Sequence, residues 1–213
     1  QNYLSEIESL PGQLENAYHS SLRLNLPEWQ GIQRVLIAGM GGSAIGADLL
    51  TAYASPLCPL PIVVQRNYYL PAWAKGAETL VVASSHSGNT EETLAVFEMA
   101  VKSNCRILAL CTGGKLAEAA KALHTPLWTF EHHGQPRAAV GYSFGMLLAL
   151  FSRLGLIPDP ADELTGAITA MRKQAASLQA SVPVVRNPAK REAGQLIGRW
   201  VMVFGADVLE PVA

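Results

Sequence analysis

Residues 79–94, TLVVASSHSGNTEETL, decide the fold of this chain. The run from Leu80 to Ala83 is uninterruptedly apolar, which is typical of a strand covered on both faces of a parallel sheet. Directly after it come a turn with hydroxyl groups at Ser85, Ser87 and Thr90 and the start of an amphipathic helical pattern. The stretch therefore predicts a buried strand, a hydroxyl-rich turn and a helix.

The turn between this strand and helix has the composition of an anion-binding site. The first amides of a helix have no partner within the helix and lie at the positive end of its dipole. Hydroxyl groups beside those amides favour a phosphate. The alternative is that serine, asparagine and threonine serve here as ordinary helix caps. Capping needs one such residue, whereas this turn has a run of them around Gly88, so we favour phosphate binding.

The same strand and helix alternation extends to both sides of this stretch. Apolar runs predict strands at 34–38, 59–64, 80–84, 106–111 and 126–130, with a helix through residues 49–53 after the loop at 39–46 and further helices at 91–103 and 115–123. Strands that alternate with helices at this spacing form a parallel sheet with helices on both faces. We therefore expect an α/β fold with a doubly wound, five-stranded parallel sheet.

The remaining segments are mostly helical in pattern. Residues 3–26 predict one or two helices with a break at Pro11 and Gly12, and residues 137–154 predict a buried helix broken or kinked around Gly141 and Gly145. A helical connector follows, and residues 200–204 read as a buried strand. Because one strand cannot make a domain, we expect the chain to stop shortly after a second domain begins. Its start at Gln1 rather than Met also predicts that the natural N-terminus is missing.

Composition limits the classes of partner. Charged residues make up 15% of the 213 residues and the formal net charge is -1, so no basic surface indicates nucleic acid or an anionic membrane. The longest apolar stretch is too short and too interrupted to span a membrane. Three cysteines without a CxxC pair fit buried thiols in a reducing compartment, and we expect a cytoplasmic protein with no metal and no nucleic acid or membrane partner.

A second glycine-rich loop, residues 39–44, GMGGSA, follows the first predicted strand. It fits the dinucleotide fingerprint, which leaves a nucleotide-dependent oxidoreductase as an alternative. The next strand ends in Gln65, Arg66 and Asn67 without the acid that would hold a ribose, so only a phosphorylated dinucleotide held by Arg66 survives as a minority interpretation. A Walker A loop is excluded because neither loop ends in GK(S/T).

The two loops are expected to meet. In a doubly wound sheet the first and third strands lie next to each other or nearly so, and ligands bind at the carboxyl edge. Gly41 and Gly42 permit close backbone approach, and Ser43 supplies another hydroxyl. We predict that Gly41, Gly42, Ser43, Ser85, Ser87 and Thr90 together surround one phosphate group.

Four motifs in this order carry a family resemblance: GMGGS at 39–43, QRNYYLP at 65–71, SHSGNTEET at 85–93 and GQPRAA at 134–139. The chain resembles the sugar isomerase (SIS) domain of the bifunctional phosphoglucose/phosphomannose isomerase family. The resemblance implies flavodoxin-like SIS domains, a homodimer and a sugar phosphate as ligand. It also implies interconversion of glucose 6-phosphate or mannose 6-phosphate with fructose 6-phosphate, without a cofactor or a metal.

The resemblance further implies a division of the chain and of its roles. We expect an N-terminal helical segment at 1–29, a first SIS domain at 30–155, a helical connector at 156–197 and the incomplete start of a second SIS domain at 198–213. The hydroxyls named above hold the phosphate, and Arg137 is the catalytic residue that faces the reacting carbons and stabilises an enediolate. The family's base and ring-opening residues, a glutamate and a histidine, lie in the second SIS domain, so this chain is expected to bind without turnover.

Three further alternatives stay open from the sequence. Glu131, His132 and His133 precede Arg137 and could supply local acid or base groups, although a solvated polar loop is the commoner explanation for such a trio. His86, which replaces the family's usual tyrosine, contacts ligand or fills space. SIS domains also serve regulators, so a non-catalytic sugar-phosphate sensor is the alternative function.

Overall fold

The computed structural model describes residues 3–213, and it contains the predicted parallel sheet. Five strands pair in the order β2-β1-β3-β4-β5, all parallel. The strands are β1 (Arg34–Ala38), β2 (Ile62–Gln65), β3 (Thr79–Ser85), β4 (Arg106–Cys111) and β5 (Leu127–Thr129). The flavodoxin-like α/β fold predicted from the sequence is confirmed, and each of the five strands predicted for this sheet is found with its ends shifted by at most three residues.

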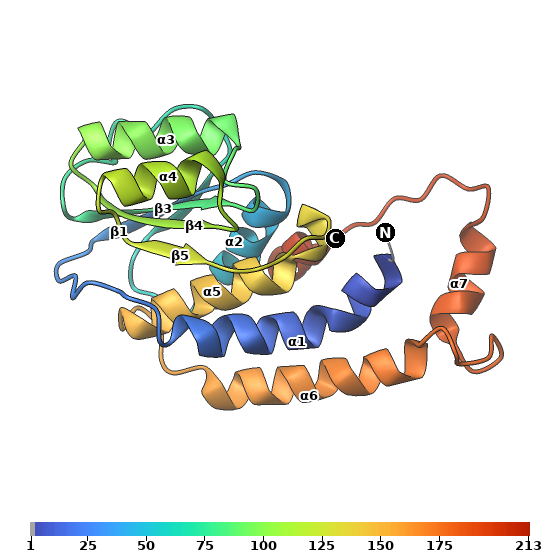
Figure 1. Ribbon diagram of the computed structural model, residues 1–213. Helices are drawn as coiled ribbons and strands as arrows, with labels where there is room; N and C mark the ends of the chain where they lie inside the picture. Colours follow the sequence, from blue (N-terminus) through green and yellow to red (C-terminus); the bar gives the residue numbers. More distant parts are fainter. Residues whose placement is uncertain (1–2) are drawn as a thin grey trace.

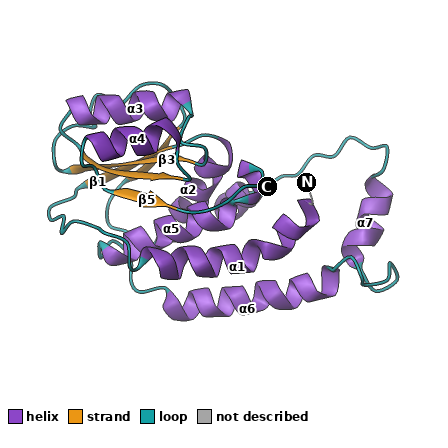
Figure 2. Ribbon diagram, in the orientation of Figure 1, coloured by secondary structure: helices purple, strands orange, loops and turns teal. Residues whose placement is uncertain are grey.

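Helices cover both faces of the sheet, as Figures 1 and 2 show. One face carries α3 (Glu91–Lys102) and α4 (Gly114–Ala122), which pack on Leu36, Val81 and Ala109. The opposite face carries α2 (Gly41–Ala54) and α5 (Val140–Arg153), which pack on the alternate residues of the same strands, Ile37, Val82 and Leu110. Successive strand residues point to opposite faces, so each strand is apolar throughout because both faces are buried.

Two further helices extend the layer beneath α5. The N-terminal helix α1 (Tyr3–Ser21) lies along α5, and α6 (Ala161–Leu178) packs below α1 (Figure 1). The prediction of a break at Pro11 is wrong, because one helix runs through Pro11. Figure 1 shows that α1 bends in its N-terminal half, which is the usual consequence of a proline inside a helix. Burial of Leu14, Ala17 and Tyr18 stabilises the turns that follow.

The prediction of a break or kink at Gly141 and Gly145 is also wrong, since α5 is one helix over both. The two glycines instead permit close packing against α1. A Cβ added at Gly145 would lie 2.9 Å from the Ala17 Cβ and 3.0 Å from the Leu14 carbonyl oxygen, and one at Gly141 would lie 2.8 Å from the Gln13 Cβ. Because Gly141 and Gly145 carry no side chain, α5 can lie close to α1.

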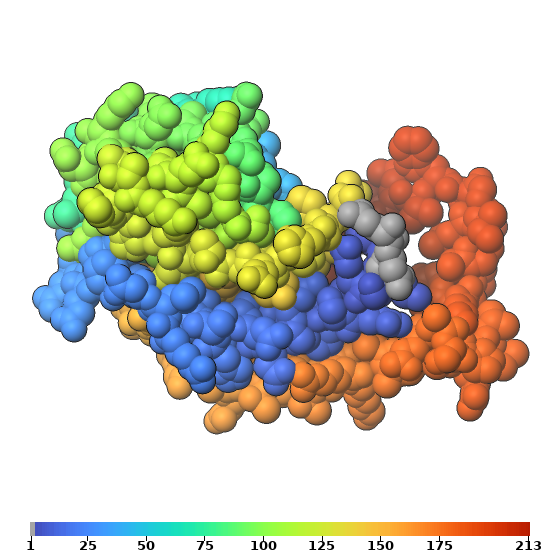
Figure 3. All heavy atoms as spheres, in the orientation of Figure 1, coloured from blue at the N-terminus to red at the C-terminus, as the bar shows by residue number. Residues whose placement is uncertain are grey.

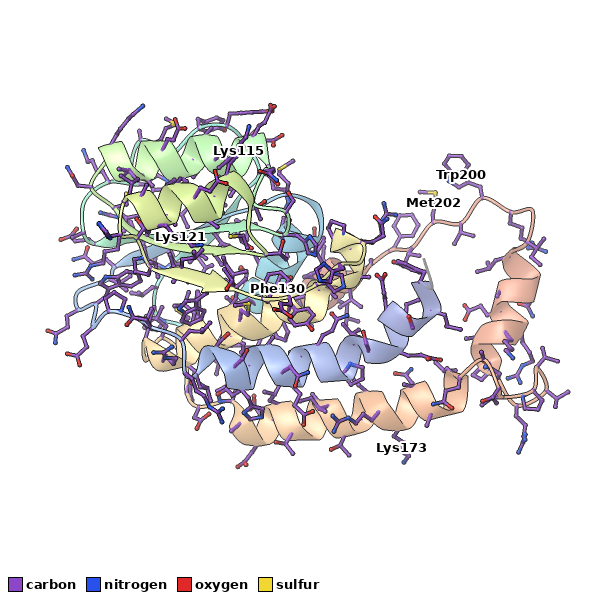
Figure 4. All side chains as sticks on the ribbon, viewed as in Figure 1. Lys115, Lys121, Phe130, Lys173, Trp200 and Met202 are labelled. Atoms are coloured by element: carbon purple, nitrogen blue, oxygen red, sulfur yellow. The ribbon has the colours of Figure 1, made fainter. Side chains whose placement is uncertain are left out.

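The C-terminal part stands out from the body of the molecule around α7 (Pro188–Leu196), as Figure 3 shows. Residues 200–204 were predicted as a buried strand, and this is wrong: they form no strand, and Trp200 and Phe204 are 91% and 81% exposed. In Figure 4, Trp200 and Met202 project away from the ribbon. The physical reason is that residues 3–213 offer this segment no strand to pair with. The last turn, η2 (Asp207–Val212), returns to pack on α2.

None of the helices described within residues 3–213 combines the length and the apolar character needed to cross a membrane. Gln1 and Asn2 of the predicted N-terminal segment lie outside the described residues.

Candidate functional site

The two glycine- and hydroxyl-containing loops meet at the carboxyl edge of the sheet. Strands β1 and β3 are direct neighbours, so the loops that follow them start side by side. The Ser43 hydroxyl, in the first turn of α2, accepts a hydrogen bond of 3.1 Å from the backbone N–H of His86 in the second loop. At Gly39 an added Cβ would lie 3.0 Å from the Ser84 carbonyl oxygen, so a side chain there would press on the end of β3. The predicted meeting of the two loops is confirmed.

Within the second loop the hydroxyls are ordered by local hydrogen bonds. The Ser85 hydroxyl accepts from the Gly88 N–H at 3.0 Å and lies 2.8 Å from the Thr90 hydroxyl. The Ser87 hydroxyl accepts from the Asn89 N–H at 3.2 Å and is exposed to solvent. Ser85 is buried and Thr90 half-buried, so the hydroxyls of this loop lie at different depths below the surface.

The two helices that begin beside these hydroxyls, α2 and α3, keep free amides in their first turns. Neither Met40, which precedes α2, nor Thr90, which precedes α3, caps its helix with a side-chain hydrogen bond. The capping alternative is therefore wrong for Thr90, whose hydroxyl contacts Ser85 instead. Uncapped amides at the start of a helix of more than ten residues are suited to hold an anion.

A third loop, between β4 and α4, supports the second loop from behind. Gly88 adopts a φ of +67°, and a Cβ there would lie 1.8 Å from the Gly113 carbonyl oxygen. Thr112 donates to the His86 carbonyl through its N–H at 2.9 Å and its hydroxyl at 2.7 Å. The Lys115 N–H donates to the Asn89 side chain at 3.1 Å. The hydroxyl loop is thus held rigidly between two neighbouring loops.

Sequence reasoning missed this supporting loop. Its signal was the glycine pair Gly113 and Gly114, one residue beyond the strand that ends at Cys111, which resembles the glycine pair in the loop at residues 39–44.

Arg137 lies on a single 3-10 turn, η1 (Pro136–Ala138), and its side chain is exposed. The turn rests on the start of α2: a Cβ at Gly42 would lie 2.5 Å from the Pro136 carbonyl oxygen and 3.2 Å from the Arg137 Cα. Gly42 was predicted to permit approach of a phosphate, and the structure shows that its open side is filled by the arginine turn. Gly41, with a φ of +51° and open space around it, remains suited to close approach of a ligand.

His86 and His132 form a pair beside the hydroxyl loop. The His86 Nε2 lies 2.9 Å from the His132 Nδ1, and the rings of Phe130 and Tyr142 pack around the two imidazoles. Figure 4 labels Phe130, which lies just beyond β5 and stacks on Tyr142 of α5. Burial, together with the charge of His132, lowers the pKa of His86.

The solvated-loop interpretation of residues 131–133 is therefore wrong for His132, which is half-buried, while Glu131 and His133 are exposed.

The dinucleotide alternative depends on Arg66, and this residue already has another partner. Arg66, directly after β2, forms an ion pair with Asp48 of α2. An arginine that already donates to a carboxylate is poorly placed to bind a ribose phosphate. The geometry therefore gives no support to a dinucleotide held by Arg66.

The comparisons with known proteins agree with this geometry. The chain is 38% identical over 200 residues to a bifunctional phosphoglucose/phosphomannose isomerase of Caldicellulosiruptor bescii, which covers 93% of this chain and 59% of the relative. It is 30% identical over 194 residues to the protein of the same name in Aquifex aeolicus, covering 87% of this chain and 56% of the relative. The resemblance predicted from the sequence is confirmed.

The chain spans less than two thirds of the length of these curated relatives. Among solved structures, the C-terminal domain of a glucosamine-fructose-6-phosphate aminotransferase from Francisella tularensis superposes with a TM-score of 0.70 at 13% identity, covering 100% of this chain and 64% of that one. That likeness shows the fold. No protein-family model matches the chain.

Proposed function

We propose that this chain is the sugar-phosphate-binding part of an aldose-ketose isomerase that interconverts glucose 6-phosphate or mannose 6-phosphate with fructose 6-phosphate. The observation that carries the proposal is the hydrogen bond between the Ser43 hydroxyl and the His86 N–H, which makes one site of two anion-binding loops. The curated relatives, named as bifunctional phosphoglucose/phosphomannose isomerases, support the substrate class.

In this proposal the phosphate ester sits between the starts of α2 and α3. The hydroxyls of Ser43, Ser85, Ser87 and Thr90 and the free helix amides hold it, with Gly41 allowing close approach. Because the phosphate does not react, its binding free energy serves to anchor and orient the open-chain sugar. Two helix N-termini supply positive potential without a lysine in either loop.

Arg137 then faces the reacting carbons. Removal of the proton from the carbon beside the carbonyl leaves an enediolate, whose oxygens carry negative charge. A guanidinium group fixed near those oxygens stabilises the transition state more than the neutral substrate, and this difference is what accelerates the reaction. A base must also move the proton between the two carbons. We propose that the base and the ring-opening group come from a second SIS domain, which residues 198–213 begin.

The assembly and the compartment are part of the same proposal. A second domain would pair with residues 200–204, whose exposed apolar side chains favour this, and the resemblance implies a homodimer. The thiols of Cys58, Cys105 and Cys111 are free and none is exposed, which fits a reducing cytoplasm. Sedimentation of the protein at several concentrations would test the dimer.

Thermal unfolding of this chain with and without sugar phosphates tests the binding site. Fructose 6-phosphate at a hundred times its Kd should raise the midpoint by roughly 5–10 °C, since binding to the folded state alone adds about 2.7 kcal/mol. Fructose without phosphate should have no effect, and Ser87→Ala, which removes an exposed hydroxyl, should reduce the shift. Absence of any shift at millimolar fructose 6-phosphate would exclude the phosphate site.

Turnover separates the isomerase from a sugar-phosphate sensor. The chain extended by the remaining segment of its Caldicellulosiruptor bescii relative should convert fructose 6-phosphate to glucose 6-phosphate, and Arg137→Gln should abolish conversion while leaving phosphate binding intact. A sensor would bind the sugar phosphate equally well and convert none in the extended form.

A further inference from the structure

We propose that Gln13 of α1 is a positioning residue that fixes the turn carrying Arg137. The inference rests on the function proposed for Arg137. Gln13 is only 4% exposed, and its side-chain Nε2 donates to the Ala138 carbonyl oxygen at 2.9 Å across a sequence separation of 125 residues. The same nitrogen donates to the Ser9 hydroxyl at 3.0 Å. A buried amide on the N-terminal helix therefore holds the residue that follows Arg137.

The arginine side chain itself has no support of this kind. Arg137 forms no ion pair and no side-chain hydrogen bond within residues 3–213, and its side chain is exposed. What the structure fixes is therefore the point from which the side chain starts, through the backbone of η1. A 3-10 turn of three residues has little internal hydrogen bonding, so its position depends on what its neighbours fix.

The turn is fixed from two opposite sides. From α2, Gly42 admits the backbone of Pro136 and Arg137 at a distance that no side chain would allow. From α1, Gln13 holds the Ala138 carbonyl, and the Glu6 carboxylate accepts a hydrogen bond of 3.3 Å from the Gln135 N–H. The first turn of α2 and the N-terminal helix α1 thus determine together where the Arg137 side chain starts.

Stability alone does not explain an amide at position 13. The Gln13 Oε1 is buried and has no hydrogen-bond partner within the described residues, so half of the amide is unsatisfied. The neighbouring contact residues on this face of α1 are apolar, Leu14 and Ala17. An apolar side chain of the same size would avoid the unsatisfied acceptor, and what it would lose is the bond to Ala138.

The test compares two ligands that share the phosphate and differ in the reacting end. Arabinonate 5-phosphate carries a carboxylate where the enediolate charge develops, and inorganic phosphate has no such group. We expect wild-type protein to bind the sugar acid more tightly than inorganic phosphate in calorimetry. Gln13→Met should reduce that ratio of affinities about tenfold, as expected for a displaced charged hydrogen bond, and leave the affinity for inorganic phosphate within twofold.

A double-mutant cycle identifies the route of the effect. Arg137→Gln should lower the ratio of affinities at least as much as Gln13→Met does. The double variant should lower it no further than Arg137→Gln alone, because both changes remove the same interaction. Ser9→Ala is the matched control: it removes the other partner of the Gln13 nitrogen and should leave the ratio unchanged. Gln13→Asn, which keeps the amide but is one methylene too short, replaces Gln13→Met if that variant does not fold.

The possible outcomes are distinct. Equal loss of affinity for both ligands in Gln13→Met, or additive effects with Arg137→Gln, would show general loosening of the fold and overturn the inference. An unchanged ratio in a folded Gln13→Met and Gln13→Asn would overturn it too. If wild-type protein shows no preference for the sugar acid, the role proposed for Arg137 fails first, and the role of Gln13 falls with it.

Discussion

The hydroxyl of Ser43 accepts a hydrogen bond from the backbone N–H of His86, and this single bond of 3.1 Å joins the loop after β1 to the loop after β3. Ser43 is buried, and its backbone N–H bonds to the Met40 carbonyl within its own loop. The side chain thus satisfies an amide of the second loop while it lies among the first residues of α2. A ligand bound by one loop therefore has a fixed position relative to the other loop.

Replacement of Ser43 by alanine should therefore weaken both stability and binding. The variant leaves the half-buried His86 N–H without its acceptor, which should lower the free energy of unfolding by about 1–3 kcal/mol. Affinity for inorganic phosphate should fall as well. Urea unfolding and calorimetry measure the two effects. Ser55→Ala, at the exposed end of the same helix, should stay within about 0.5 kcal/mol of wild type; equal losses in both variants would mean that the bond contributes nothing specific.

Gly88 and Gly76 form a matched pair that tests the packing of the loop between β3 and α3. Both adopt a left-handed φ, of +67° and +73°, but only Gly88 has a neighbour where a Cβ would stand. Gly76→Ala should lose about 1–2 kcal/mol of unfolding free energy from backbone strain alone. Gly88→Ala should lose at least about 2 kcal/mol more because its Cβ meets the Gly113 carbonyl oxygen. Similar losses in the two variants would show that the loops separate freely.

Gly145 and Gly166 should respond to alanine with opposite signs. Gly166 lies in α6 with nothing near its Cβ position, so Gly166→Ala should raise the unfolding free energy by about 0.5–1 kcal/mol. Gly145→Ala should instead lower it by about 1–3 kcal/mol, since the new methyl meets Ala17 and the Leu14 carbonyl. Chemical denaturation of both variants checks the signs. A stabilised Gly145→Ala would contradict the close packing of α5 on α1.

His86 should make the stability of the protein depend on pH below about 6.5. Its pKa is lowered in the folded state by burial and by the charge of His132, whereas the unfolded chain has an ordinary histidine pKa near 6.5. Between those two values the unfolded state binds more protons, so stability is complete above about pH 6.5 and declines as the pH falls toward the lowered pKa. Unfolding free energies at pH values from 8 to 5 would show this slope.

The controls for this slope are two single variants. His86→Phe should remove most of it, and His133→Gln, which changes an exposed neighbour, should keep it. A slope unchanged in His86→Phe would assign the titration to another group.

Local pattern predicted most of the fold because the strands of this sheet are covered on both faces. Continuous apolar runs such as Leu80 to Ala83 mark buried parallel strands, and glycine and hydroxyl residues mark where they end. The candidate site followed from the same reasoning, since the loops that contain Ser43 and Ser85 come after neighbouring strands. Contacts within one strand, turn and helix could therefore be predicted from the sequence.

The errors arose where the partner lies far along the chain. Gly141 and Gly145 indicated a kink in isolation, but they are contact points for α1, whose residues lie more than 120 positions earlier. Gln13 gave no signal, because a glutamine on a helix is ordinary until Ala138 is seen beside it. The run at 200–204 had the composition of a strand, but composition cannot supply a neighbouring strand.

The packing of α1 against α5 has a consequence for synthesis of the protein. Residues 3–21 leave the ribosome well before the helix that covers Leu14, Ala17 and Tyr18, which ends only at Arg153. Until α5 has been made, the N-terminal helix has no place to dock, and its apolar side is open to chaperones or to other nascent chains. The arginine turn is completed at the same late moment, so the site becomes competent only when the first and the last elements of the domain come together.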